Sequence, residues 1–226
     1  MKTRISKYFI LMFVMILSIL TLLQTPKKVS AVEMADSFKQ GSGTISDPYQ
    51  IKDESEFLLF KNDPSFTNSH FILVSDIIVT SQLGDGTNNT INMFNTFGGS
   101  FNGNSFTITY LASNEVIGNN FGGIAGTITT NYTTKNDNCT DETGSISNVN
   151  VKGTFNVVGD NVGGLVGEVK TISAPTDVYY ESLTLKANTF NTVSFDGNLD
   201  VTGSNVGQIF SSVISVHSLS KSSYHI

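Results

Sequence analysis

VNVKGTFNVVGDNVGGL (149–165) and VSFDGNLDVTGSNVGQI (193–209) overlay without a gap, and this internal repeat decides the fold. Seven of the 17 aligned positions are identical: three valines, three glycines and one asparagine. The glycine-rich part occurs a third time, as GNNFGGIAG (118–126), 41 residues before GDNVGGLVG (159–167). Self-similarity at a nearly constant spacing is the signature of an architecture in which similar units stack on one another.

Short stretches with alternating apolar residues, rich in β-branched and aromatic side chains, lie within and around the repeat and predict strands. They are 105–111, 145–151, 153–158, 178–185 and 191–201. Glycine and asparagine gather between them at 98–104, 118–123, 159–164 and 203–207, and these residues tolerate the left-handed backbone of tight corners. We therefore expect an all-β protein, a right-handed parallel β-helix (β-solenoid) of five or six coils over residues 41–215. A propeller blade has a similar length, but three units would not close a ring.

The amino terminus predicts a secretory signal peptide over residues 1–31. Basic residues at 2, 4 and 7 precede an apolar run from Tyr8 to Leu23, and small residues follow at 29–31. The apolar run is shorter than a comfortable membrane span, although an uncleaved anchor is the alternative. Residues 32–40 are expected to be a linker and 216–226 a carboxyl-terminal tail, with no stable membrane span after signal removal.

Three segments outside the repeat carry further expectations. DESEFLLFKND (53–63) predicts a short helix, capped by Asp53 or Ser55 and ended by Pro64. HFILVSDIIVT (70–80) predicts a buried strand pair, and QLGDGTNN (82–89) predicts a turn. TTNYTTKNDNCTDETG (129–144) predicts a polar loop.

Composition excludes several function classes. Five of the 13 basic residues precede Ala31 and all 19 acidic residues follow it, which leaves the exported chain with a net charge of −11. Such a chain repels phosphate backbones, so we expect no nucleic-acid partner. A single cysteine, Cys139, excludes an internal disulfide framework and a four-cysteine zinc site.

Several motifs resemble a known group of proteins. GSGTISDPYQI (41–51) and HFILVSDIIV (70–79) resemble the opening of bacterial secreted repeat proteins, and FGGSFNGNSFTITYL (97–111) resembles their F-x-G-x-F-D-G-N-G-H-x-I-x-x-L pattern. GGIAG (122–126) and VGGLVG (162–167) resemble the GLUG motif. Such motifs occur in adhesin-like surface proteins and in non-catalytic regions of immunoglobulin A-cleaving metallopeptidases.

This resemblance implies a β-helix-like fold and an interaction role, and it carries over no catalytic residue. The chain departs from the pattern at a few positions, which are Asn102, Ser105, Phe106, Gln208 and Ser211. The last two replace motif glycines, so the third repeat is decayed or forms a terminal cap.

The chemistry-bearing residues give little support to catalysis. None of His70, His217 and His225 is followed by glutamate, so the H-E-x-x-H zinc motif is missing. The acids are scattered, at Asp47, Asp53, Asp76, Asp160, Asp196 and Asp200, with one looser group at Asp137, Asp141 and Glu142. The adjacent Tyr179 and Tyr180 place one aromatic ring outward.

We therefore expect a secreted or cell-surface, adhesin-like interaction module without catalytic activity, catalytic residues, cofactor or metal. Its expected partner is an extracellular glycan or protein, and the expected state is a monomer. Two alternatives remain open. One is a polysaccharide-acting β-helix enzyme, a lyase or glycoside hydrolase, which needs two neighbouring carboxylates. The other is a truncated fragment of a larger surface protein.

Overall fold

The computed structural model describes residues 32–135, 138–171 and 189–215. The predicted signal peptide (1–31), the predicted strand at 178–185 and the predicted tail (216–226) lie outside the described residues.

The described residues are mostly β, as predicted, with short strands and one α-helix. The helical elements are α2 (Glu54–Asn62) and a single 3-10 turn, η1 (Pro64–Phe66). The strands before the repeat are β1 (Tyr49–Ile51), β2 (His70–Leu73), β3 (Ile77–Val79), β4 (Leu83–Gly84), β5 (Ile91–Asn92) and β6 (Thr96–Phe97). The predicted helix is therefore confirmed, and two strands lie within 70–80, although β2 pairs with β1 and β7 (Ser100–Asn102), β3 pairs with β8 (Thr107–Tyr110), and the two do not pair with each other.

The strands that follow form three tiers, named here by residue range. The first tier (100–135) holds β7 (Ser100–Asn102), β8 (Thr107–Tyr110), β9 (Glu115–Ile117), β10 (Phe121–Gly122) and β11 (Ala125–Lys135). After β12 (Asn138–Thr143), the second tier (145–171) holds β13 (Ser145–Val158), β14 (Val162–Gly163) and β15 (Val166–Thr171). The third tier (189–215) holds β16 (Thr189–Thr202), β17 (Val206–Gly207) and β18 (Phe210–Ser215).

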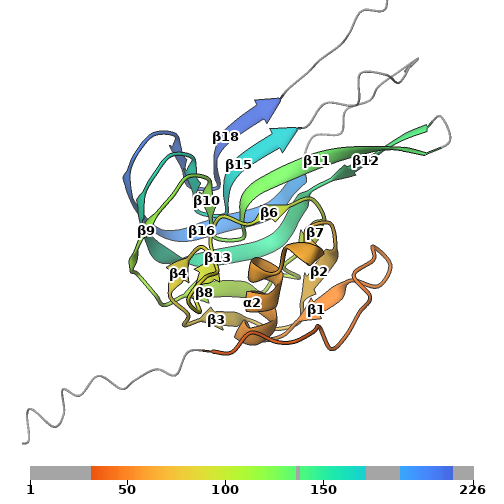
Figure 1. Ribbon diagram of the computed structural model, residues 1–226, viewed down its shortest axis with the longest axis horizontal. Helices are drawn as coiled ribbons and strands as arrows, with labels where there is room; N and C mark the ends of the chain where they lie inside the picture. Colours follow the sequence, from red (N-terminus) through yellow and green to blue (C-terminus); the bar gives the residue numbers. More distant parts are fainter. Residues whose placement is uncertain (1–31, 136–137, 172–188, 216–226) are drawn as a thin grey trace, which may run out of the picture. The chain divides into compact units, whose positions relative to one another are not determined.

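The tiers stack through parallel pairing. β13 is long enough to pair with β7, β8 and β9 in turn, and it pairs with β16 along its other edge. β10, β14 and β17 form a second parallel sheet, and β11, β15 and β18 lie side by side in a third (Figure 1). The β2 strand pairs with β7 and with β1, which continues the first sheet toward the amino terminus.

The sequence repeat corresponds directly to this pairing. Val149 is aligned with Val193 and Gly153 with Gly197, so the gapless overlay of the two stretches is the register of β13 and β16. Phe121, Val162 and Val206 are likewise aligned across the three tiers. Because side chains alternate between the two faces of a strand, this register places apolar residues over apolar residues.

Aromatic rings fill the space between the sheets. The Phe155 ring lies in the middle of the stack, with ring centroids 5.2 Å from Tyr110, 5.0 Å from Phe121 and 5.6 Å from Phe195. A second cluster around Phe60 includes Phe71, Phe97 and Phe101. These rings exclude water from the polar groups discussed below.

A column of asparagines closes one corner of each tier. Asn120, Asn161 and Asn205 have positive φ angles of 60°, 57° and 56°. The Asn161 side-chain amide donates to Asn120 Oδ1 at 2.8 Å, and the Asn205 amide donates to Asn161 Oδ1 at 3.0 Å. Asparagine suits this corner twice over, because it tolerates the left-handed backbone and its amide both donates and accepts.

Two sequence expectations are corrected. The segment predicted as a polar loop (129–144) forms instead the ends of an antiparallel hairpin, in which β11 pairs with β12 from Thr130–Thr143 to Lys135–Asn138. Its threonines favour extended backbone, which outweighs the polar composition that suggested a loop. The strands predicted separately at 145–151 and 153–158 form one strand, β13, because Gly153 continues the pairing with Gly197.

Replacing the central asparagine of the column tests its two contributions separately. Asn161→Gly keeps the left-handed corner but removes two amide hydrogen bonds, which we expect to cost about 1–3 kcal/mol. Asn161→Ala adds the strain of a left-handed alanine, about 1 kcal/mol more. Urea unfolding of both variants measures the difference. Equal stability of the alanine and glycine variants would contradict the backbone argument.

Candidate functional site

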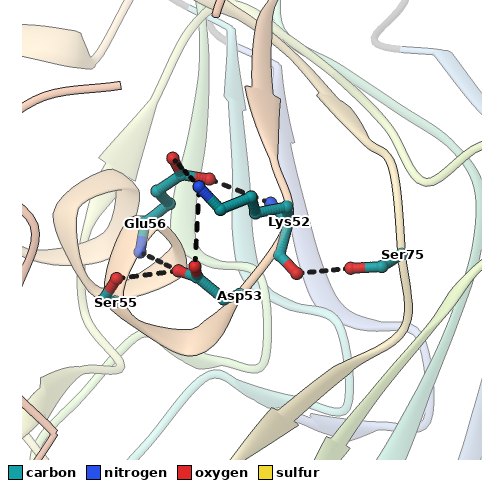
Figure 2. A network of polar contacts seen from close by, with 5 residues as sticks. All are labelled: Lys52, Asp53, Ser55, Glu56 and Ser75. Atoms are coloured by element: carbon teal, nitrogen blue, oxygen red, sulfur yellow. Dashed lines mark hydrogen bonds and ion pairs between the residues drawn. The ribbon is translucent and has the colours of Figure 1, made fainter. Parts of the chain in front are cut away.

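The amino-terminal end of α2 is held by a network of five residues (Figure 2). Asp53 is the N-cap, and its carboxylate accepts hydrogen bonds from the Glu56 backbone N–H at 3.1 Å and the Ser55 hydroxyl at 2.7 Å. Glu56, only 2% exposed, accepts in return from the Lys52 backbone N–H and ammonium. The Ser75 hydroxyl donates to the Lys52 carbonyl.

This network is explained by helix capping. Asp53 and Glu56 have the spacing of a capping box, and Asp53 accepts from the Glu56 N–H as in that motif, whereas Glu56 accepts from the N–H of Lys52, one residue before the N-cap. Burial raises the pKa of Asp53, but the hydrogen bonds from Ser55 and Glu56 and the nearby Lys52 charge lower it overall. Both carboxylates are thus engaged in hydrogen bonds that fix the start of α2.

The carboxyl-terminal end of α2 carries a buried lysine. Lys61 is 1% exposed, and its ammonium donates to three backbone carbonyls, Gly122 at 3.2 Å, Gly123 at 3.4 Å and Ile124 at 2.9 Å. None of the ion pairs found among the described residues involves Lys61. The lysine therefore fastens the helix to the first GLUG-like segment by hydrogen bonds to backbone alone.

Burial lowers the pKa of Lys61 well below its usual range. A charged ammonium has three N–H donors, which matches the three carbonyls, whereas a neutral amine has two. The Tyr110 hydroxyl donates to the Gly123 carbonyl as well, and burial raises the pKa of that phenol. The site thus gathers an amino group and a phenol at one glycine turn, inside an apolar shell.

The same helix end borders a pocket of about 290 Å³. Phenylalanine rings, amides, hydroxyls and one carboxylate line it: Phe60, Lys61, Asn62, Asp63, Pro64, Phe66, Thr67, Asn92, Phe94, Asn95, Thr96 and Phe97. The pocket lies between the end of α2 with η1 and the stretch from β5 to β6. It is thus bounded by segments about 30 residues apart in the sequence.

Hydrogen bonds make the walls of this pocket rigid. The Asn62 amide donates to the Thr90 carbonyl at 3.0 Å, and its Oδ1 accepts from the Asn92 backbone N–H at 2.9 Å. The Asp63 carboxylate accepts from the Ser65 backbone N–H at 2.9 Å. The side-chain oxygen of Asn95 is buried and accepts no hydrogen bond from the described residues. A buried acceptor without a donor is costly, and because this oxygen exposes almost no surface, that cost falls on the folded chain itself.

The residues considered from sequence are distributed over the fold and are not gathered in one site. Asp76 accepts from the Thr107 backbone N–H, Asp160 from the Ser204 backbone N–H, and Asp196 pairs with Lys152 at 3.2 Å. Asp47 lies in a turn and Asp200 lies exposed on β16. His70, on β2, bonds through Nδ1 to the Ser100 hydroxyl at 2.7 Å.

Other candidates fall in segments where side chains are not described. Asp141 and Glu142 lie on β12, as does Cys139, and only their backbone pairing is known. Asp137, Tyr179, Tyr180, His217 and His225 lie outside the described residues. Within residues 32–135, 138–171 and 189–215, no group of three or more His, Cys, Asp or Glu residues could hold a metal ion. Over the same ranges, no helix is long and apolar enough to cross a membrane.

Comparison with known proteins found no matching family model, curated protein or solved structure.

Sequence reasoning missed both Lys61 and the pocket. A lysine in the last turn of a helix normally faces solvent and favours the helix dipole, so its position alone indicates nothing unusual. The run Phe57–Phe60 gives a weak signal, since four consecutive apolar residues mean that α2 is surrounded by protein. Asn95 has no sequence signal, because the free acceptor depends on contacts between segments.

Neutralising the buried lysine should change how stability depends on pH. Burial lowers the Lys61 pKa in the folded chain, so between that pKa and 10.5 the unfolded chain binds more protons than the folded one. The free energy of unfolding therefore rises with pH over this range. Lys61→Met should remove this rise, which is at most about 1.4 kcal/mol per pH unit for one proton. Urea unfolding between pH 7 and 9.5 measures it, with the half-exposed Lys52→Met as control. Identical slopes in all three proteins would refute the assignment.

Proposed function

We propose that this chain is an extracellular, adhesin-like binding module built on a right-handed parallel β-helix, with a glycan as the ligand of the pocket beside α2. The parallel, in-register tiers support the β-helix, since each tier hydrogen-bonds to the next along several strands. The resemblance to secreted GLUG-motif repeat proteins and the predicted signal peptide support the extracellular location.

The main support for a glycan ligand is that both aromatic and polar side chains line the pocket. Phe66 and Phe94 are partly buried aromatic rings, which suit the apolar face of a sugar ring. Asn92, Asn95 and Thr67 supply polar groups, and Asp63 can accept from a hydroxyl. A sugar presents the same alternation of C–H faces and hydroxyls, and a rigid pocket binds it with little loss of conformational freedom.

The pocket favours binding over hydrolysis. Glycoside hydrolysis by the common mechanism needs two carboxyl groups about 5–10 Å apart. Asp63 is the only carboxylate among the residues that line this pocket, and its oxygen is already engaged with the Ser65 backbone. The polysaccharide-acting alternative therefore gains no support from this region.

Glycan-array binding of the exported protein tests the proposal. We expect a defined set of glycans to bind, and Asn95→Ala to weaken that binding about tenfold through the loss of one polar side chain that lines the pocket. Phe66→Ala should weaken it further by removing a ring. Asn198→Ala, an exposed asparagine on β16, is the matched control and should bind normally. A blank array, or full binding by the Asn95 and Phe66 variants, would overturn the glycan assignment.

A further inference from the structure

The two ends of the stacked sheets differ in how they are closed. The Gln50 backbone N–H of β1 donates to the Gln40 carbonyl, and the Phe38 ring stacks on Tyr49 with centroids 4.7 Å apart. Phe38 also contacts Phe66 and Phe71, so residues within 32–40 cover the amino-terminal end. At the other end, no described strand pairs with the outer edge of β16, β17 or β18.

Among the described residues, the third tier presents a partly exposed apolar surface at this end, called here the open face. It is formed by inward-directed side chains that pack on the core but are only partly buried: Phe190, Val193, Phe195, Leu199, Val201 and Ile209. Residues at the same register one tier earlier are buried, with exposures of 2% for Val149 and 0% for Val151, Phe155 and Val157. The difference arises because β13 has a strand on each side, whereas β16 has one only on the β13 side.

The asparagine column also stops at the open face. Asn161 Oδ1 accepts from Asn205, but nothing described donates to Asn205 Oδ1. The backbone N–H and C=O groups on the outer edge of β16 also have no strand partner among the described residues. An edge strand of this kind is a template for pairing with another chain. The hydrogen bonding that joins the second and third tiers can therefore be extended by a strand from another chain.

We propose that the open face binds a second copy of this chain, open face to open face, giving a closed two-fold dimer. The closed amino-terminal end argues against head-to-tail stacking, which would need that end as well. Contact between two identical faces is isologous and stops at two subunits. The proposal does not depend on the glycan pocket, and it differs from the monomer expected from the sequence.

The sequence of β16 is suited to antiparallel pairing with itself about Gly197. In that register Val193 lies opposite Val201 of the second copy, and Phe195 lies opposite Leu199, so the apolar side chains share one face. On the outward face, Asp196 lies opposite Asn198, and Asp200 lies opposite Ser194. No two like charges are therefore directly opposed, although this strand carries two carboxylates.

Sedimentation equilibrium of the full exported chain tests the dimer. We expect twice the chain mass at micromolar concentration. Ser194→Asp places a carboxylate opposite Asp200 at two symmetry-related positions, which should raise the dimer dissociation constant roughly 100-fold, tenfold for each pair. Thr154→Asp adds the same charge one tier inward and should leave the dimer intact. A chain that stays monomeric at up to roughly 100 µM would overturn the proposal, and this is the result expected if residues 216–226 cover the open face. Equal dimerisation of the Ser194→Asp and Thr154→Asp variants would overturn it as well.

A cysteine pair tests the register independently of affinity. In a Cys139→Ser background, Ser194→Cys with Asp200→Cys should form a covalent dimer under mild oxidation, visible on a non-reducing gel. Ser194→Cys alone should not, because residue 194 faces residue 200 and lies far from its own copy. Cross-linking by the single variant, or none by the pair, would rule out this register.

Discussion

The fold depends on one constraint, the in-register stacking of successive tiers. Hydrogen bonds between β13 and its neighbours on both edges fix the spacing, and the asparagine column from Asn120 to Asn205 fixes the corner. A shift by one residue would move Phe155 and Phe195 out of the interior, since side chains alternate along a strand. Burial of the aromatic rings and satisfaction of the backbone thus require the same register, which is why the sequence repeats.

The α2 helix converts this repetitive scaffold into one with a distinct end and a pocket. Its amino-terminal acids are engaged in capping, and its last turn sends Lys61 to three carbonyls of the first GLUG-like segment. This attachment is costly, since it buries a basic amino group in an apolar surrounding, but it fixes the neighbouring Asn62 and Asp63 at the wall of the pocket. The glycine turn, the buried lysine and the pocket therefore form one connected region.

Much of the architecture was predictable because it follows local rules repeated along the chain. Alternating apolar residues predicted the strands, Gly–Asn clusters predicted the corners, and Asp53 predicted the start of the helix. The hairpin at β11 and β12 was missed because polar composition outweighed the β-propensity of its threonines. The pocket and Lys61 were missed for another reason: each depends on contacts between residues about 30 to 60 positions apart, and no pattern along the sequence encodes those contacts.

The most direct measurement of the stacking is a disulfide scan across β13 and β16 in a Cys139→Ser background. The Ser194 hydroxyl donates to Asn150 Oδ1 at 2.9 Å, so cysteines at 150 and 194 should form an intramolecular disulfide under mild oxidation. Cysteines at 150 and 198 lie four residues out of register and should remain reduced. Oxidation of the shifted pair with no reaction of the aligned pair would contradict the register on which the account rests.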